Sequence, residues 1–144
     1  MPDIILAVSE HKDALDLARR LAESGYGSRI TVGAQETLYA AESAQAQGVN
    51  AVVLDSGLVG RAAAAEQRNL VQEIKSISKK ACQRTRDTQP LPVVILMTRH
   101  WSDITNKLLK EAVDSSDAVI YAPVSPSDLR LQLGDLLTLR KGLG

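Results

Sequence analysis

Short apolar runs that alternate with longer amphipathic segments most constrain the fold of this 144-residue chain. The runs are rich in β-branched residues, and the first of them, residues 4–8, is continuously apolar, as expected of a strand that is covered on both faces. Between them, apolar residues recur at helical spacing. This order predicts one parallel sheet with helices on both faces, joined by right-handed crossovers. The predicted strands span residues 4–8, 28–34, 51–55, 91–98 and 118–122.

Glycine, proline and serine mark where the predicted helices begin and end. Gly25 and Gly48 are expected to end the first two helices, because glycine tolerates the left-handed backbone found there. Ser102 is the expected N-cap of the fourth helix. Ser125 and Pro126 are expected to begin the last helix, as N-cap and first helical residue.

A long helical pattern fills most of the segment between the third and fourth strands. We expect a turn at Ser56-Gly57 and Gly60, because glycine permits a positive φ. The helix that follows carries Cys82, interpreted as a small core residue. Its apolar face is predicted to consist of Leu70, Ile74, Ile77 and Ala81.

Composition bounds the class of protein. The length suits one domain, so we expect residues 1–144 to form a single unit. Seventeen basic and seventeen acidic residues balance, which disfavours nucleic acid as a partner. A single cysteine fits a reducing compartment, and no run reaches the ~20 apolar residues that span a bilayer. With no signal-peptide pattern at the start, we expect a cytoplasmic protein without membrane contact.

Polar side chains follow the predicted strands at the edge where ligands bind in open α/β sheets. Ser9 and Glu10 follow the first strand, and Asp55 ends the third. Thr98 ends the fourth strand, and Ala122 ends the fifth. We therefore expect the Glu10 and Asp55 carboxylates to share one edge.

This order of strand ends resembles the receiver domain of two-component response regulators, a flavodoxin-like three-layer α/β/α fold with strand order 2-1-3-4-5. The resemblance covers nearly the whole chain and rests on "ILAVSEH", "VVLDSGL", "VILMTRH" and "VIYAPVSPSDL". It implies that Asp55 is the phosphoacceptor. It also implies that Thr98 supplies the Thr or Ser hydroxyl with which the fourth strand ends in that family. It also implies a Mg²⁺ site formed by Glu10, Asp55 and the Gly57 carbonyl.

The chain departs from the receiver pattern where the chemistry needs charge. Ser9 replaces the first of two metal-binding acids, and Ala122 replaces the lysine that contacts phosphate. Arg99 stands where the family has a small residue; it could supply the missing cation or fill the pocket. Val119 stands where the family has its aromatic switch residue. Phosphoryl transfer depends on neutralising charge on the phosphoryl oxygens, so these losses favour a degenerate, non-enzymatic receiver without a resident cofactor.

Two other functions stay open. Asp55 could still accept a phosphoryl group at an altered site. The stretch "LPVVILMTRHWSDITNKLLKEAVDSSDAVIY" is also similar to the N-terminal wing domain of bacterial ornithine, lysine and arginine decarboxylases, which assembles subunits. If the receiver resemblance holds, the Ala122–Pro123 bond is expected to be cis.

The partner expected from the resemblance is a protein, either another protein or a second copy of this chain. Its contact surface is expected to be the C-terminal face formed by the fourth helix, the fifth strand and the last helix. Leu131 and Leu139 lie off the main apolar stripe of that last helix and supply exposed apolar surface. A second candidate surface is the basic stripe Lys75, Lys79, Lys80, Arg84 and Arg86, which suits an acidic protein or is simply solvated.

Overall fold

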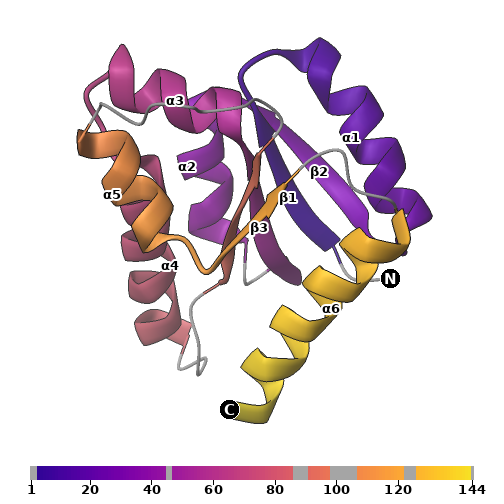
Figure 1. Ribbon diagram of the computed structural model, residues 1–144. Coiled ribbons are helices and arrows are strands. Elements are labelled where there is room, and N and C mark those ends of the chain that lie inside the picture. The colour runs from indigo at the N-terminus through magenta and orange to yellow at the C-terminus, as the bar shows by residue number, and fades with distance from the viewer. Residues whose placement is uncertain (1–2, 45–46, 86–90, 98–106, 122–125, 144) are drawn as a thin grey trace.

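The structure is a computed structural model that describes residues 3–44, 47–85, 91–97, 107–121 and 126–143. Its five strands form one parallel sheet in the order β2-β1-β3-β4-β5 (Figure 1). The flavodoxin-like order predicted from the sequence is confirmed. The strands are β1 Asp3–Val8, β2 Gly27–Val32, β3 Val49–Asp55, β4 Val93–Met97 and β5 Ala118–Tyr121.

Helices cover both faces of the sheet. Helices α1 and α6 pack on one face, while α2, α4 and α5 pack on the other (Figure 1). Helix α3 lies across the edge at which the strands end. The helices are α1 His11–Glu23, α2 Ala34–Ser43, α3 Ser56–Ala64, α4 Leu70–Thr85, α5 Lys107–Ser115 and α6 Pro126–Leu143.

Alternate side chains of each central strand enter two separate apolar cores. On β3, Val52 and Leu54 belong to the core beneath α2, α3, α4 and α5, whereas Ala51 and Val53 belong to the core beneath α1 and α6. Strands β1, β3 and β4 are buried almost throughout. This burial on both faces is the reason for their continuously apolar sequences.

The predicted end of the first helix holds, since Gly25 directly follows the C-cap of α1, whereas α2 ends at Ser43, before the predicted stop at Gly48. Gly25 and Gly48 have φ angles of +94° and +78°, in the left-handed region that glycine tolerates. Pro126 is the first residue of α6. Ser102 and Ser125, the predicted N-caps, lie outside the described residues, and the described part of α5 begins at Lys107.

The segment after β3 differs from its prediction. The turn expected at Ser56-Gly57 and Gly60 is wrong, because these residues form the first turns of helix α3. The single long helix is also wrong: α3 and α4 are separate helices. Leu58 and Val59 are buried in the core, and this burial outweighs the poor helix propensity of the two glycines.

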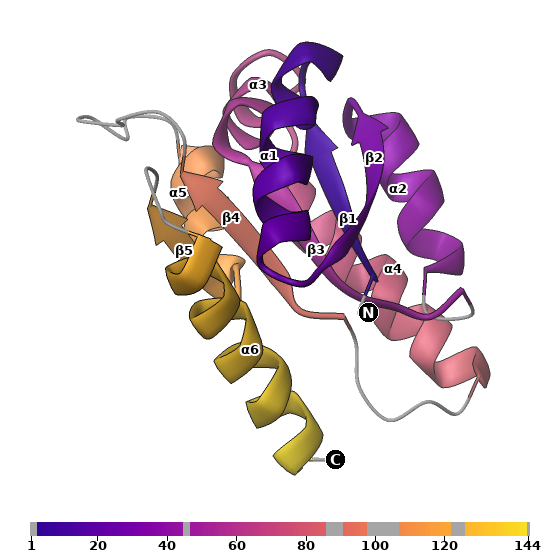
Figure 2. The same cartoon turned by 90° about the vertical axis from the view of Figure 1, so that its right-hand side faces the viewer.

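Helix α6 is held to the sheet mainly by its first half. Leu129 and Leu133 are buried, as the apolar stripe predicted, and Leu136 and Leu137 pack against the same core. The second half continues past the edge of the sheet at which the strands begin (Figures 1 and 2). This part of α6 therefore has no sheet beneath it.

Candidate functional site

The candidate site lies where β1 and β3 end. These two strands are neighbours, with Ala7 opposite Leu54, so the residues that follow them meet at one edge of the sheet. On its other side, β3 pairs with β4, and Asp55 lies opposite Leu96. Ser9, Glu10 and Asp55 thus share the edge that the sequence predicted.

Asp55 is a buried carboxylate at the start of a helix. It is the last residue of β3 and the N-cap of α3, with extended backbone angles, and only 4% of it is exposed. The first N–H groups of a helix point back toward its N-cap, and the helix dipole favours negative charge there. The local structure therefore stabilises an anion at this position.

Gly57 lies directly against the Asp55 carboxylate. A Cβ atom at Gly57 would stand 3.1 Å from Asp55 Oδ2 and 3.5 Å from Ser9 Oγ. The first distance is tighter than ordinary carbon–oxygen contact, so a side chain at this position would displace the carboxylate by a few tenths of an ångström. Asp55 Oδ2 and Ser9 Oγ therefore both lie close to Gly57.

The helical conformation of Gly57 changes what its backbone offers. In an α-helix each carbonyl points toward the C-terminal end and accepts a bond from the N–H four residues later. The Gly57 carbonyl is therefore directed along α3 toward Arg61, away from Asp55. It is poorly placed for the metal contact that the receiver resemblance implied.

Glu10 is directed toward another partner. Its Oε2 atom lies 3.1 Å from Lys12 Nζ, and both side chains are exposed. Among the described residues, no three His, Cys, Asp or Glu side chains are grouped closely enough to hold a metal ion. Mg²⁺ is usually bound through one or two carboxylates, with water supplying the rest of its octahedral oxygen set, so the Mg²⁺ site implied by the resemblance remains a prediction.

Several residues named by the resemblance lie outside the described part of the chain. These are Thr98, Arg99, Ala122 and Pro123, so the expected cis bond and the phosphate contacts remain predictions. Val119, at the family's aromatic switch position, is partly buried and packs against the core that includes α5. A valine there has no large ring to move between buried and exposed positions.

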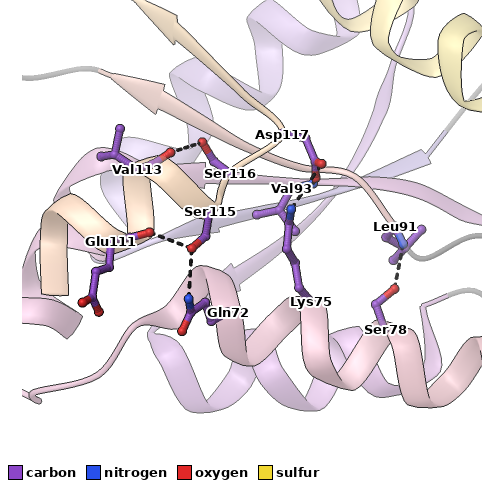
Figure 3. Close-up of polar contacts among 10 residues, drawn as sticks. All are labelled: Gln72, Lys75, Ser78, Leu91, Val93, Glu111, Val113, Ser115, Ser116 and Asp117. Atoms are coloured by element: carbon purple, nitrogen blue, oxygen red, sulfur yellow. Dashed lines mark hydrogen bonds and ion pairs between the residues drawn. The ribbon is translucent and has the colours of Figure 1, made fainter.

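The basic stripe on α4 is partly structural. Lys75 Nζ lies 3.2 Å from Asp117 Oδ1, an ion pair that joins α4 to the residue before β5 (Figure 3). Lys79 and Lys80 are exposed on the same helix. The side chain of Arg84 and the whole of Arg86 lie outside the described residues. Lys75 thus contributes to the fold and is not available in full to a partner.

Asp117 is a residue whose role the sequence did not reveal. Its Oδ2 atom accepts a 2.7 Å hydrogen bond from the Val93 N–H, and its own N–H donates to the Val93 carbonyl at 2.8 Å (Figure 3). Nearby, Ser78 Oγ accepts a bond from the Leu91 N–H, and Gln72 donates to Ser115 Oγ. These bonds join α4, β4, α5 and β5 at the edge opposite to Asp55.

Two large apolar side chains are exposed on the predicted partner face. Tyr121 at the end of β5 is 70% exposed, and Leu131 on α6 is 62% exposed. The side chain of Leu139 lies outside the described residues. Strand β5 is also an edge strand of the sheet. The face formed by α5, β5 and α6 therefore carries apolar surface that folding of this chain leaves in solvent.

Solved structures of response-regulator proteins share this fold. A receiver domain from Clostridium thermocellum matches with a TM-score of 0.70 and 17% identity over the whole of both chains. A CheY-like receiver domain from Methanospirillum hungatei matches with a TM-score of 0.60 and 21% identity, again over both whole chains. A structure described as a family of streptococcal redox sensors evolved from two-component response regulators matches 99% of this chain, with a TM-score of 0.61 and 19% identity, and 54% of its own length is covered.

These comparisons define the class of fold. No protein-family model and no curated protein sequence matches this chain. The structural likeness, at low identity, shows that the chain has the flavodoxin-like fold of receiver domains. No helix in the described ranges combines the length and apolar character needed to cross a membrane.

Proposed function

We propose that this chain is a degenerate receiver: a signalling and protein-interaction module that is not an enzyme and whose Asp55 is not efficiently phosphorylated. The observation that carries the proposal is the burial of Asp55 at the N-terminus of α3, with the Gly57 carbonyl directed away from it. In the sequence, Ser9 also stands where receiver domains have a metal-binding acid, and Ala122 stands where they have the phosphate-binding lysine. Removing one preorganised donor from other active sites costs about 10²–10³ in rate, so several losses leave a very slow reaction.

A second function for the receiver fold is consistent with one of the matched structures. The streptococcal proteins are described as redox sensors that evolved from response regulators, so the fold there serves a different input. The single cysteine of the present chain, Cys82, is buried on α4, and we do not propose a redox input here. The matched structures favour the receiver resemblance over the resemblance to the decarboxylase wing domain. We also propose that the protein is cytoplasmic.

The partner of this module is proposed to be a protein that binds the face of α5, β5 and α6. The exposed Tyr121 and Leu131 supply apolar anchors of the kind that dominate protein interfaces. A second copy of this chain can fill this role as well as another protein. Nucleic acid is not proposed, since the net charge is zero and the basic stripe is only a local concentration of positive charge.

Intact-mass spectrometry after incubation with Mg²⁺ and acetyl phosphate tests the proposal. We expect no stoichiometric phosphoryl adduct under conditions that fully label a standard receiver domain run in parallel. Asp16→Asn, at an exposed aspartate, is the matched control for Asp55→Asn. A stoichiometric adduct that survives in Asp16→Asn and is lost in Asp55→Asn would show that the site is an active phosphoacceptor and that the proposal is wrong.

A further inference from the structure

The helix that covers Asp55 is built unevenly. The first five residues of α3, "SGLVG", include two glycines and a serine, whereas the following segment contains four consecutive alanines, Ala62 to Ala65. Glycine is among the poorest helix formers and alanine is the best. The first turn of α3, residues 56–60, therefore has the lowest helix propensity of any part of this helix.

The two ends of α3 are also anchored differently. At the C-terminal end, the Ala65 N–H donates to the Arg61 carbonyl at 2.9 Å, and the Arg68 N–H donates to the Ala62 carbonyl at 3.0 Å. Arg68 Nε then donates to Glu73 on α4 at 2.9 Å. At the N-terminal end, Gly57 contributes no side chain.

We propose that the N-terminal turn of α3, residues 56–60, is a gate over Asp55. In the helical form a Cβ at Gly57 would stand 3.1 Å from Asp55 Oδ2, and only 4% of Asp55 is exposed. Local unwinding at Gly57 and Gly60 exposes it, because both glycines adopt loop conformations at low cost. Access to Asp55 is then set by the population of the unwound turn.

Buried side chains keep the gate closed most of the time. Leu58 and Val59 are almost fully buried, and their burial outweighs the propensity lost at two glycines. The unwound turn is therefore a minor state.

Leu58 and Val59 share a core with Ala112 of α5, and Leu109 and Val113 pack against that core. Unwinding that withdraws either side chain alters the support of α5, so the gate links Asp55 to the proposed partner face. This inference deepens the proposed function and rests on it only for that last link.

Carboxyl footprinting measures the gate directly. The chain is treated at neutral pH with a water-soluble carbodiimide and glycine ethyl ester, and the labelling rate of each carboxylate is followed by peptide mass spectrometry. We expect Asp55 to label far more slowly than the exposed Asp16. In Gly60→Ala the Asp55 rate is expected to fall about five-fold, the factor that corresponds to the ~1 kcal/mol difference in helix propensity between alanine and glycine.

Gly134→Ala is the matched control. It makes the same substitution in α6, where the added Cβ would stand at an ordinary contact distance of 3.9 Å from the Tyr26 hydroxyl. It should leave the Asp55 labelling rate unchanged. Circular dichroism confirms that each variant is folded before labelling.

Amide hydrogen exchange on the unmodified chain gives a second measurement that needs no variant. We expect the Val59 and Gly60 amides to exchange faster than the Ala63 and Ala64 amides, since only the first turn opens. The gate is wrong if these four amides are equally protected, if Asp55 labels as fast as Asp16, or if Gly60→Ala leaves the Asp55 rate unchanged. Neither measurement depends on whether Asp55 accepts a phosphoryl group, so this inference and the proposed function can fail separately.

Discussion

Tyr26 lies beneath α6, where its hydroxyl faces Gly134 and its ring belongs to the core shared with α1. Burial raises the pKa of the Tyr26 phenol above its usual 10.0, and the nearby Arg130 opposes this in part. The folded state thus holds the phenol proton more tightly than the unfolded state does. Its contribution to stability is complete below pH 10 and is lost as the pH rises through the folded-state pKa, because the unfolded chain ionises first.

The free energy of unfolding in urea at pH 8 and pH 11 measures this effect. Relative to Tyr26→Phe, the unmodified chain should lose additional stability between these two values. Tyr39→Phe, at a tyrosine that is 77% exposed, should lose stability in parallel with the unmodified chain. Equal losses in Tyr26→Phe and the unmodified chain would show that the phenol pKa does not differ between the two states.

Asp55 illustrates how far single residues could be predicted from the sequence. An apolar run ending in an acid places Asp55 at the carboxyl edge of the sheet, because parallel strands end together. The sequence could not reveal that Gly57 lies against this carboxylate. That contact depends on α3 beginning one residue after β3, and glycine-rich segments are usually turns.

Among contacts between elements, the one between α4 and the start of β5 depends mainly on the side chain of Asp117. Asp117→Ala removes the acceptor of the part-buried Val93 N–H, and a lost hydrogen bond to a charged group costs about 1.5–3 kcal/mol of unfolding free energy. Lys75→Ala removes only the ion pair, in which the two side chains are 35% and 34% exposed. Pairs of this kind contribute about 0–1 kcal/mol. Chemical denaturation should therefore rank Asp117→Ala as clearly more destabilising than Lys75→Ala; similar losses would show that the ion pair dominates.

Helix α3 shows why one element was missed. The strands follow from continuous apolar runs, and α1, α4 and α6 follow from helical spacing, because burial imposes both patterns. In α3, Leu58, Val59 and Ala62 are buried over barely two turns, too short a stretch for a periodic signal to stand out. The helix exists because tertiary burial overrides the preference of its glycines.

At the scale of the whole molecule, the parallel sheet was predicted from short runs rich in β-branched residues, and its strand order was implied by the receiver resemblance. The chemistry of the edge was not predicted, since it depends on loops and on α3. The same separation holds for the surface: α1, α2, β5 and α6 each expose a large apolar side chain, and composition alone does not show which of them contacts a partner. Leu15 on α1 and Leu131 on α6 are both 62% exposed, but only Leu131 lies on an element of the predicted partner face.

Self-association through that face is the corresponding prediction. Sedimentation velocity over a concentration series should show a reversible dimer of the unmodified chain. Leu131→Asp should raise the dimer dissociation constant by about tenfold or more, because it places a charge where an apolar anchor was buried. Leu15→Asp, equally exposed on α1, should leave the dissociation constant unchanged. A strict monomer at high concentration would exclude a second copy as the partner, while equal effects of the two substitutions would place the dimer contact on another face.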